Sequence, residues 1–560
     1  MKWNASYPDP WRPTVDAVTA VPAPTNEPVH TYAPGSPERD RLVDRLAQLS
    51  ANRTEIKQVV GGVHSDGGGE RTDVVQPHRH AAVLGTFAHS TREDVARAID
   101  AAAAAAPAWR DLSFDDRAAV FLRAADLLAG PWRETIAAAT MLGQSKSAYQ
   151  AEIDSPCELI DFWRFNVSFA RQILADQPVS SPGVWNRVEY RPLEGFVYAI
   201  TPVNFTAIAG NLPTAPALMG NTVLWKPSPT QSVAAYLTLQ LLEAAGLPPG
   251  VINLVHGDGP TVSEVALNDR RLAGIHFTGS TATFQHLWRT VGENIARYDS
   301  YPRLVGETGG KDFVVAHASA DPDVLTTALI RGAFDYQGQK CSAASRAFVP
   351  ASVWKVMGDR LIETASSLRY GDVADLSNFG GAVIDRKAFA RNAAALERAK
   401  QVPGLTVAAG GACDDSEGFF VDPTVLLGDD PTDEAFSTEY FGPILAVHVY
   451  DDAKPDAFAD ILRAVDGGSR YALTGSVIAT DRTAVEKATH ALRFAAGNFY
   501  VNDKPTGAVV GQQPFGGARA SGTNDKAGSP QNLLRWASAR TLKETFVPPT
   551  DHTYPHQGVQ

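Results

Sequence analysis

The chain has 560 residues, which is enough for two or more domains with a hydrophobic core each. Hydrophobic residues make up 44% and charged residues 20% of the sequence, proportions that are ordinary for a globular enzyme. The formal net charge of −12 argues against nucleic acid as the partner, and three cysteines without paired spacing exclude a disulfide framework and a cysteine zinc site.

Residues 1–24 lack the continuous apolar segment of a signal peptide, and they are too acidic and too poor in arginine for a typical mitochondrial transit peptide. No run in the sequence approaches the ~20 apolar residues that a membrane-spanning helix needs. We therefore expect no membrane partner and a cytoplasmic location. Residues 1–35 are rich in proline, asparagine and aspartate, and we expect them to form an irregular arm over a neighbouring surface.

The part of the chain before residue 175 is predicted to be mainly helical. Thr91, followed by Asp94, predicts a capped helix that continues through the alanines at 101–106. The segment 147–174 is predicted to be buried helix, with Glu158 at the edge of its aromatic stripe as a minor functional candidate. Apolar spacing predicts further helices over residues 36–50, 114–128 and 132–141.

Two histidines, His78 and His80, lie in the polar stretch QPHRHA after a glycine-rich loop. Their spacing could suit a metal ion, but no third ligand is in view. We therefore expect a solvated loop and no metal.

From residue 184 on, strands and helices alternate. Residues 184–190 alternate in polarity after Pro182-Gly183 and predict an exposed hairpin. Strand–helix repeats then specify a parallel, doubly wound sheet, whose ligands bind beyond the carboxyl ends of its strands. The predicted strands of this sheet are 196–200, 222–225, 251–255, 274–278 and 303–305. A second α/β set is predicted from residue 312, and a final strand at 542–547 is expected to pair away from the body.

The segment RGAFDYQGQKCSAASR, residues 331–346, carries the most distinctive chemical group. Cys341 follows a helical run and a glycine-containing turn, which can place a thiol at the mouth of a pocket near free backbone N–H groups. Those donors and the neighbouring Lys340 would favour the nucleophilic thiolate. A cysteine of this kind can also be a small buried hydrophobic residue, so the residue alone leaves both interpretations open.

Two polar residues lie at the carboxyl ends of predicted strands. Gly279-Ser280 follows one strand and precedes a helix, an arrangement that suits a phosphate or a simple helix cap equally well. Lys226 ends the strand TVLWK, where it could bind ribose or phosphate oxygens or be solvated.

Seven segments occur in the order and spacing of the aldehyde dehydrogenase superfamily, which the chain resembles from about residue 30 to 550. They are PVNFTAI (202–208), LWKPS (224–228), FTGS (277–280), ETGGK (307–311), QGQKCSAASR (337–346), EYFGPIL (439–445) and QQPFGGARASGTNDKAG (512–528). Within this superfamily, the Lys-Cys-Ser triplet at 340–342 and the segment 498–525 resemble the Δ1-pyrroline-5-carboxylate dehydrogenases, in a monofunctional form without a fused proline dehydrogenase domain.

The resemblance implies an α/β fold with a Rossmann-type cofactor domain, an α/β catalytic domain and a β-flap for oligomerisation. It implies oxidation of L-glutamate γ-semialdehyde to L-glutamate with NAD, in proline catabolism. Its domains are expected as an arm at 1–35, a cofactor domain at 36–175 and 194–306, a catalytic domain at 307–505, a flap and tail at 176–193 and 530–560, and a substrate anchor region at 506–529.

The resemblance also implies catalytic roles for three residues. Cys341 would attack the aldehyde carbon, and the Asn204 amide with the Cys341 backbone N–H would hold the resulting oxyanion. Glu307 would activate the hydrolytic water as a general base.

For the cofactor, the resemblance implies contacts with the ribose groups, the pyrophosphate and the nicotinamide. NAD is expected, and some use of NADP is left open because Pro229 stands where many NAD-specific relatives carry a glutamate. The implied cofactor residues are Lys226, Gly279, Ser280, Glu439, Phe441, Thr201 and Pro202.

For the substrate, the resemblance implies a carboxylate anchor formed by Ser342 and the backbone of Gly507 and Ala508. The aromatic rings of Phe205 and Phe515 would enclose the methylene chain, and Glu158 would face the ammonium group.

Three other interpretations were compared with this one. Another NAD(P)-dependent semialdehyde dehydrogenase, such as one for succinate semialdehyde, would call for arginine anchors. A cysteine hydrolase would need a histidine base near Cys341. A catalytically inactive binding protein would be expected to lack Cys341, Glu307 or Asn204, and all three are present. We further expect a homodimer or a higher homo-oligomer and transient contact with a proline dehydrogenase.

Overall fold

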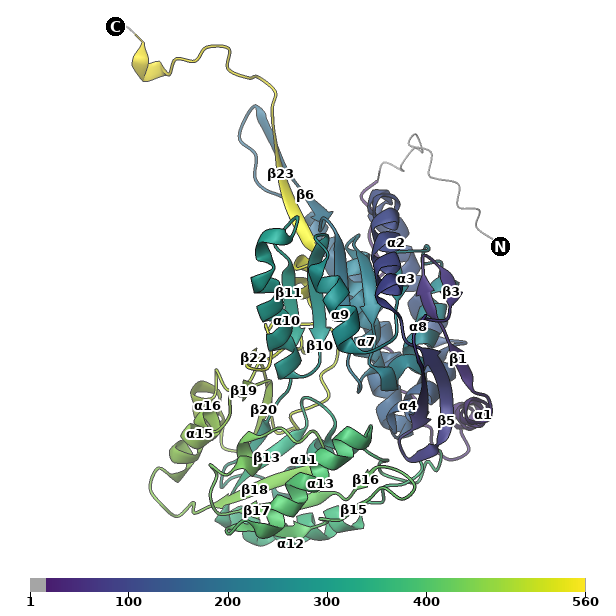
Figure 1. The fold of residues 1–560 in the computed structure, drawn as a ribbon. Helices are drawn as coiled ribbons and strands as arrows, with labels where there is room; N and C mark the ends of the chain where they lie inside the picture. Colours follow the sequence, from purple (N-terminus) through teal and green to yellow (C-terminus); the bar gives the residue numbers. More distant parts are fainter. Residues whose placement is uncertain (1–16, 559–560) are drawn as a thin grey trace.

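The structure, a computed structural model, describes residues 17–558, so residues 1–16 of the predicted arm and 559–560 of the tail lie outside the described part. Two seven-stranded sheets form the framework of the fold. Strands from residues 58–65 and 196–307 make the first sheet, and strands from 312–501 make the second. In Figure 1 the strands of the first sheet lie above those of the second.

The first sheet has the strand order β11-β10-β7-β8-β9-β2-β3. Its strands are β2 (Gln58–Val60), β3 (Val63–Ser65), β7 (Phe196–Ile200), β8 (Thr222–Lys226), β9 (Ile252–Leu254), β10 (Leu272–Thr278) and β11 (Arg303–Glu307). Strands β7 to β11 pair in parallel, and β2 and β3 add an antiparallel hairpin at one edge. The helices between the parallel strands are α7 (Thr206–Leu218), α8 (Ser232–Ala244), α9 (Gly259–Asn268) and α10 (Thr281–Glu293). The predicted parallel sheet with crossover helices is confirmed.

The second sheet has the order β14-β17-β18-β13-β12-β20-β21, in which only the edge strand β14 is antiparallel. Its strands are β12 (Asp312–Ala316), β13 (Ala344–Pro350), β14 (Leu405–Ala409), β17 (Thr424–Gly428), β18 (Ile444–Tyr450), β20 (Thr474–Ile478) and β21 (Asn498–Val501). Helices cover both faces: α11 (Pro322–Phe334), α12 (Ala351–Ser367), α13 (Arg386–Gln401), α15 (Ala457–Gly467) and α16 (Arg482–Ala491). Phe313 and Val315 belong to one buried cluster and Val314 to another, as expected for a strand buried on both faces.

The N-terminal part packs against the first sheet as a group of helices. They are α1 (Pro37–Ala51), α2 (Arg92–Asp111), α3 (Phe114–Ala129), α4 (Arg133–Gln144), α5 (Ala148–Glu152) and α6 (Glu158–Ala175). The predicted cap of α2 is confirmed, because the Asp94 N–H donates to Thr91 Oγ1 over 3.2 Å. A small sheet of β1 (Thr54–Ile56), β4 (Arg71–Gln76) and β5 (Arg79–Ala88) was not predicted.

The predicted hairpin at 184–190 is wrong as a local structure. Its residues belong to β6 (Val184–Pro192), which pairs antiparallel with β23 (Ala537–Thr545), from Val184 opposite Thr545 to Pro192 opposite Ala537. The partner strand thus comes from the other end of the chain, which local turn signals cannot reveal. In Figure 1 this two-stranded ribbon extends away from the body of the molecule.

The expected solvated loop around His78 is also wrong. Its imidazole is buried, with Nδ1 3.2 Å from Ser145 Oγ and Nε2 3.3 Å from an Asp372 carboxylate oxygen. The ring is thus held by a hydrogen bond at Nδ1 and by the proximity of a carboxylate to Nε2, and it is not surrounded by solvent. His80 is half-buried, and its Nε2 lies 2.9 Å from the Asp415 carbonyl oxygen.

Short elements complete the described chain. They are β15 (Cys413–Asp414), β16 (Phe420–Val421), β19 (Tyr471–Ala472), β22 (Ala518–Arg519), α14 (Glu434–Ser437) and α17 (Pro530–Leu534). Within residues 17–558, no helix is long and apolar enough to span a membrane.

Candidate active site

The carboxyl ends of four neighbouring parallel strands gather five of the predicted cofactor residues and the predicted base Glu307. Thr201 and Pro202 follow β7, Lys226 ends β8, Gly279 and Ser280 follow β10, and Glu307 ends β11. Adjacent parallel strands end at the same edge of a sheet, so these residues from distant positions become neighbours. The structure places these residues together at this edge of the first sheet.

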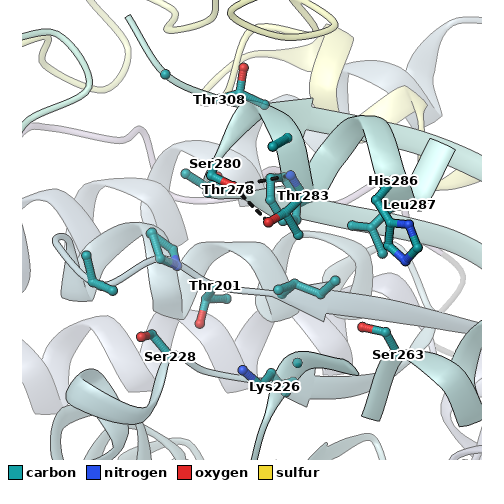
Figure 2. Close-up of a pocket in the computed structure, with 18 of the residues that line it drawn as sticks. Thr201, Lys226, Ser228, Ser263, Thr278, Ser280, Thr283, His286, Leu287 and Thr308 are labelled. Carbon is teal, nitrogen blue, oxygen red and sulfur yellow. Dashed lines mark hydrogen bonds between the residues drawn. The ribbon is translucent and has the colours of Figure 1, made fainter. Parts of the chain in front are cut away.

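A cavity of about 1060 Å³ opens over this edge. Figure 2 shows Ser280 and Thr278 across the cavity from Lys226 and Ser228. Ser280 is the N-cap of α10, and its Oγ accepts from the Thr283 N–H over 3.2 Å. The start of this helix therefore presents its positive end to the cavity, an arrangement that favours a phosphate.

The pKa values of two ionisable side chains that line this cavity are shifted by burial. Burial lowers the pKa of Lys226 to about 8, against the opposing effect of Asp258. Burial raises the pKa of Glu439, although Oε1 accepts from the Gly310 N–H over 2.8 Å and this bond favours the charged form. Phe441, two residues later, lines the same cavity with a left-handed φ of 52°. Ribose hydroxyl groups would accept a hydrogen bond from the Lys226 ammonium and donate one to the Glu439 carboxylate.

The loop before the thiol has an unusual backbone. Tyr336, Gln337 and Gly338 have φ values of 50°, 53° and 63°, in the left-handed region that costs non-glycine residues roughly 1–2 kcal/mol each. Tertiary contacts fix this conformation, because Gln337 Nε2 donates to the carbonyl oxygens of Ser145 (2.9 Å) and Ala382 (3.0 Å). The loop is therefore held from two separate parts of the chain.

The next residue, Gln339, links this loop to Ile384 and to Asn204. Its Oε1 accepts from the Ile384 N–H over 2.8 Å, and its carbonyl oxygen accepts from Asn204 Nδ2, also over 2.8 Å. A primary amide has two N–H bonds, so Asn204 retains one donor for another acceptor. The structure thus brings Asn204 next to the loop of Cys341, as the resemblance implies.

Cys341 lies between two cavities and lines both of them. The first is the cavity at the edge of the first sheet, and the second has a volume of about 870 Å³. Cys341 precedes β13 of the second sheet, whereas Glu307 ends β11 of the first, so the thiol lies where the two sheets meet.

Lys340, whose role the sequence leaves open, does not direct its charge to the thiol. The Lys340 ammonium donates to Gln150 Oε1 and lies 3.5 Å from Asp154 Oδ2, so its charge is engaged elsewhere. Burial raises the pKa of the Cys341 thiol well above its usual range, and the Glu307 carboxylate raises it further, whereas the Cys341 backbone N–H lowers it. The resting site therefore favours the neutral thiol.

The electrostatics of Glu307 suit a general base. Burial raises its pKa to about 8, while the Lys526 ammonium lowers the pKa and the Asp525 carboxylate raises it. Because the pKa of a general base should lie near the working pH, this value suits proton abstraction.

The second cavity contains the predicted substrate residues. Ser342, Gly507, Ala508, Phe205, Phe515 and Glu158 all line it. Ser342 Oγ lies 2.7 Å from Thr506 Oγ1, and both hydroxyls are buried. Within the described range, the backbone N–H groups of Gly507 and Ala508 donate to no acceptor of the chain, so they are available to a ligand carboxylate.

Glu158 belongs to a group of buried charges at the cavity wall. Burial raises its pKa well above the usual range and Asp154 raises it further, while Lys146 and Lys340 lower it. Lys146 Nζ lies 2.7 Å from Asp154 Oδ2 and 4.1 Å from the centre of the Phe205 ring.

Three residues of this second cavity were missed by the sequence reasoning. Thr506 was missed although it directly precedes Gly507, and Lys504 and Arg331 add positive charge to the cavity wall. Only the proximity of Thr506 and Lys504 to the anchor segment could have indicated them. Lys146, which approaches Phe205, had no sequence signal, since its role depends on the fold.

Comparison with known proteins agrees with this geometry. The sequence model of the aldehyde dehydrogenase family matches residues 63–542. The mitochondrial delta-1-pyrroline-5-carboxylate dehydrogenase of Mus musculus is 49% identical over 534 residues, which cover 95% of this chain and 94% of the mouse chain. The NAD-bound crystal structure of the delta-pyrroline-5-carboxylate dehydrogenase from Mycobacterium tuberculosis superposes with a TM-score of 0.94 at 71% identity, covering 97% of this chain and 100% of that one.

A second similar structure belongs to a longer protein. Proline utilization A from Bdellovibrio bacteriovorus, inactivated by N-propargylglycine, has a TM-score of 0.88 and 30% identity, covering 95% of this chain and 54% of its own.

The predicted cytoplasmic location is contradicted by these comparisons and is wrong. The relatives from Mus musculus, Homo sapiens and Dictyostelium discoideum are all named as mitochondrial proteins. That prediction was based on the composition of residues 1–24. A targeting signal is recognised by a receptor, and the packed fold contains no feature from which the location could be inferred.

Gly338→Ala tests the constraint on the catalytic loop. An added Cβ would lie 2.2 Å from the Gly442 carbonyl oxygen, at a φ of +63°. We expect a lower free energy of unfolding, by about 2–4 kcal/mol, and a loss of aldehyde oxidation of roughly 100-fold as the thiol moves. Gly292→Ala is the matched control, because nothing lies within 4 Å of its added Cβ. Equal urea midpoints and equal turnover for the two variants would contradict the constraint.

Proposed function

Because the chain belongs to the aldehyde dehydrogenase family, we propose that it oxidises L-glutamate γ-semialdehyde to L-glutamate with NAD, the step of proline catabolism that consumes Δ1-pyrroline-5-carboxylate. One observation carries the proposal: a single thiol, that of Cys341, lines a dinucleotide-sized cavity on one side and a carboxylate-binding cavity on the other. A reaction between two bound molecules at one sulfur needs this arrangement.

The first cavity suits NAD. The start of α10 at Ser280 would hold the pyrophosphate, while Lys226 and Glu439 would hold the two ribose groups and Phe441 would pack beside the nicotinamide. When bound, NAD accepts the hydride. Thr201, Pro202 and Gly279 would complete the wall with small or apolar surface.

The chemistry of the chain begins at Cys341. Its thiolate attacks the aldehyde carbon and forms a thiohemiacetal, whose oxyanion is held by the free N–H of Asn204 and the Cys341 backbone N–H. Loss of hydride from that carbon leaves a thioester. Glu307 then removes a proton from water, and the resulting hydroxide attacks the thioester, releases the Cys341 thiolate and leaves glutamate.

The second cavity accounts for the substrate. The carboxylate of glutamate semialdehyde would accept from the unpaired N–H groups of Gly507 and Ala508 and from the Ser342 hydroxyl. Phe205 and Phe515 would contact the methylene groups, and Glu158 would face the ammonium group when ionised. Donors of this kind at a fixed distance from the thiol favour an aldehyde that carries a carboxylate.

The domain division and the assembly belong to the same proposal. The cofactor domain would comprise 36–175 and 194–306, the catalytic domain 307–505, and the anchor region 506–529. The ribbon of β6 and β23, with residues 176–193 and 530–560, would join two subunits at least, because the edge of a two-stranded ribbon is free to pair. The similarity to proline utilization A supports transient contact with a proline dehydrogenase.

Replacement of the thiol tests the central step. We expect Cys341→Ala to abolish NADH formation from glutamate semialdehyde, followed by absorbance, because no other group would form the thioester. Cys413→Ala is the matched control, since this cysteine lies in β15 and lines neither cavity. Activity that survives in Cys341→Ala would contradict the proposal. A wild-type preference for succinate semialdehyde would contradict the substrate assignment alone.

The pH dependence tests Glu307. A general base must be ionised, so with a pKa of about 8 we expect the rate of thioester hydrolysis to rise as pH increases through about 8. The Lys526 ammonium lowers the pKa of Glu307, so Lys526→Met should move the rising limb to higher pH, by up to about one unit. Lys526→Arg retains the charge and should keep the wild-type profile. Identical profiles for the Met and Arg variants would exclude this role of the charge.

A further inference from the structure

Residues 26–32 of the predicted arm form a fixed part of the wall of the second cavity. From here on, the arm means these seven residues. Asn26, Glu27, Val29, Thr31 and Tyr32 line that cavity together with the substrate residues. The arm has no regular secondary structure, so its position depends on side chains of the body that accept and donate its hydrogen bonds.

Two buried charged residues hold the backbone of the arm. Glu152 accepts from the His30 N–H over 2.9 Å and from the Tyr32 hydroxyl over 2.7 Å. Arg133 donates to the Pro28 carbonyl oxygen over 2.7 Å and to Glu152. Because both side chains are almost fully buried, the contacts are protected from water, and the arm is a wall rather than a mobile lid.

At the beginning of the arm, Asn26 connects three parts of the chain. Its Nδ2 donates to Asp161 of α6 over 2.7 Å and to the Val510 carbonyl oxygen over 2.8 Å. Its Oδ1 accepts from Gln512 Nε2 over 2.9 Å. Asp161 also accepts from the Glu27 N–H over 2.7 Å, so the amide of Asn26 is fixed from both sides.

Residues 507–512, here called the anchor loop, depend on this amide. Gly507 and Gly511 have φ values of 95° and 82°, so the backbone of the loop is intrinsically permissive. The other hydrogen bonds of the loop run within residues 507–513. In the part of the chain that the structure describes, each hydrogen bond from the anchor loop to a distant segment ends on Asn26.

We propose that Asn26 is a positioning residue for substrate specificity: it holds the anchor loop so that the N–H groups of Gly507 and Ala508 face the carboxylate of the substrate. This inference rests on the proposed function of the second cavity. Asn26 acts through Val510 and Gln512 and has no part in the steps at Cys341. Its loss therefore weakens the binding of aldehydes that carry a carboxylate and leaves the chemistry and the NAD site unchanged.

Steady-state kinetics of Asn26→Ala test the proposal. We expect the KM for glutamate semialdehyde to rise about ten-fold, with kcat and the KM for NAD within two-fold of the wild type. The kcat/KM for butanal, an aldehyde without a carboxylate, should stay within two-fold. Thr25→Ala is the matched control, because this neighbouring side chain is exposed and makes no hydrogen bond in the described part of the chain. A general loss with both aldehydes, or an unchanged KM for the semialdehyde, would overturn the proposal.

A second variant acts from the side of the loop. Gln512→Ala removes one of the two links to Asn26 and should raise the same KM by about three-fold, and the double variant should not exceed Asn26→Ala by more than two-fold. Fully multiplicative effects would show that the two residues act independently and would overturn the proposal.

Hydrogen–deuterium exchange separates the failure of this proposal from that of the proposed function. In Asn26→Ala, amide exchange in residues 507–513 should become faster, while exchange in α6 and in Thr25→Ala should match the wild type. If the wild type does not oxidise glutamate semialdehyde, the proposed function fails, and faster exchange still supports the role of Asn26 in holding the loop. Unchanged exchange overturns that role whatever the substrate.

Discussion

The left-handed backbone of residues 336–338 is the constraint on which the site depends. The segment would relax in isolation, because two of its three residues carry a Cβ that disfavours a positive φ. Gln337 holds it by donating to Ser145 at the end of α4 and to Ala382 between α12 and α13, and the buried His78 ring contacts the same Ser145. The position of the thiol is thus determined by packing of segments that are far apart in sequence. A cysteine placed this way is half-buried and can be reached from two cavities.

Burial shifts the pKa values of three ionisable groups of the site in the direction that favours their neutral forms. It lowers the pKa of Lys226 to about 8, raises that of Glu307 to about 8, and raises that of the Cys341 thiol. All three shifts favour the neutral form in the structure without ligands. A cationic nicotinamide ring near the sulfur would favour the thiolate electrostatically. Binding of the cofactor would therefore prepare the site for reaction.

The sequence predicted those parts of the protein whose signals are local. The parallel strands of the first sheet are apolar runs separated by helices of crossover length, and the residues at their carboxyl ends meet by geometry alone. The small sheet of β1, β4 and β5 was missed because its strands have mixed polarity. The ribbon was predicted as a hairpin because β6 carries the turn signals, whereas its partner β23 lies about 350 residues away. The sequence left the role of Lys340 open, although it is adjacent to the thiol, and in the structure its side chain extends to Gln150 and Asp154.

The same distinction separates the chemistry of this site from its selectivity. Cys341, Glu307 and Asn204 lie in short motifs at strand ends: Glu307 is the last residue of β11, Asn204 follows β7 and Cys341 precedes β13. The proposed carboxylate anchor has no such support: its loop contains two glycines with positive φ and lies beyond the last strand of the second sheet. Its geometry has to be supplied by another segment, and the structure supplies it through Asn26, 484 residues before Val510. Long-range contacts of this kind allow the anchor to change with its surroundings while the catalytic residues remain in place, which is how one fold can serve several aldehydes.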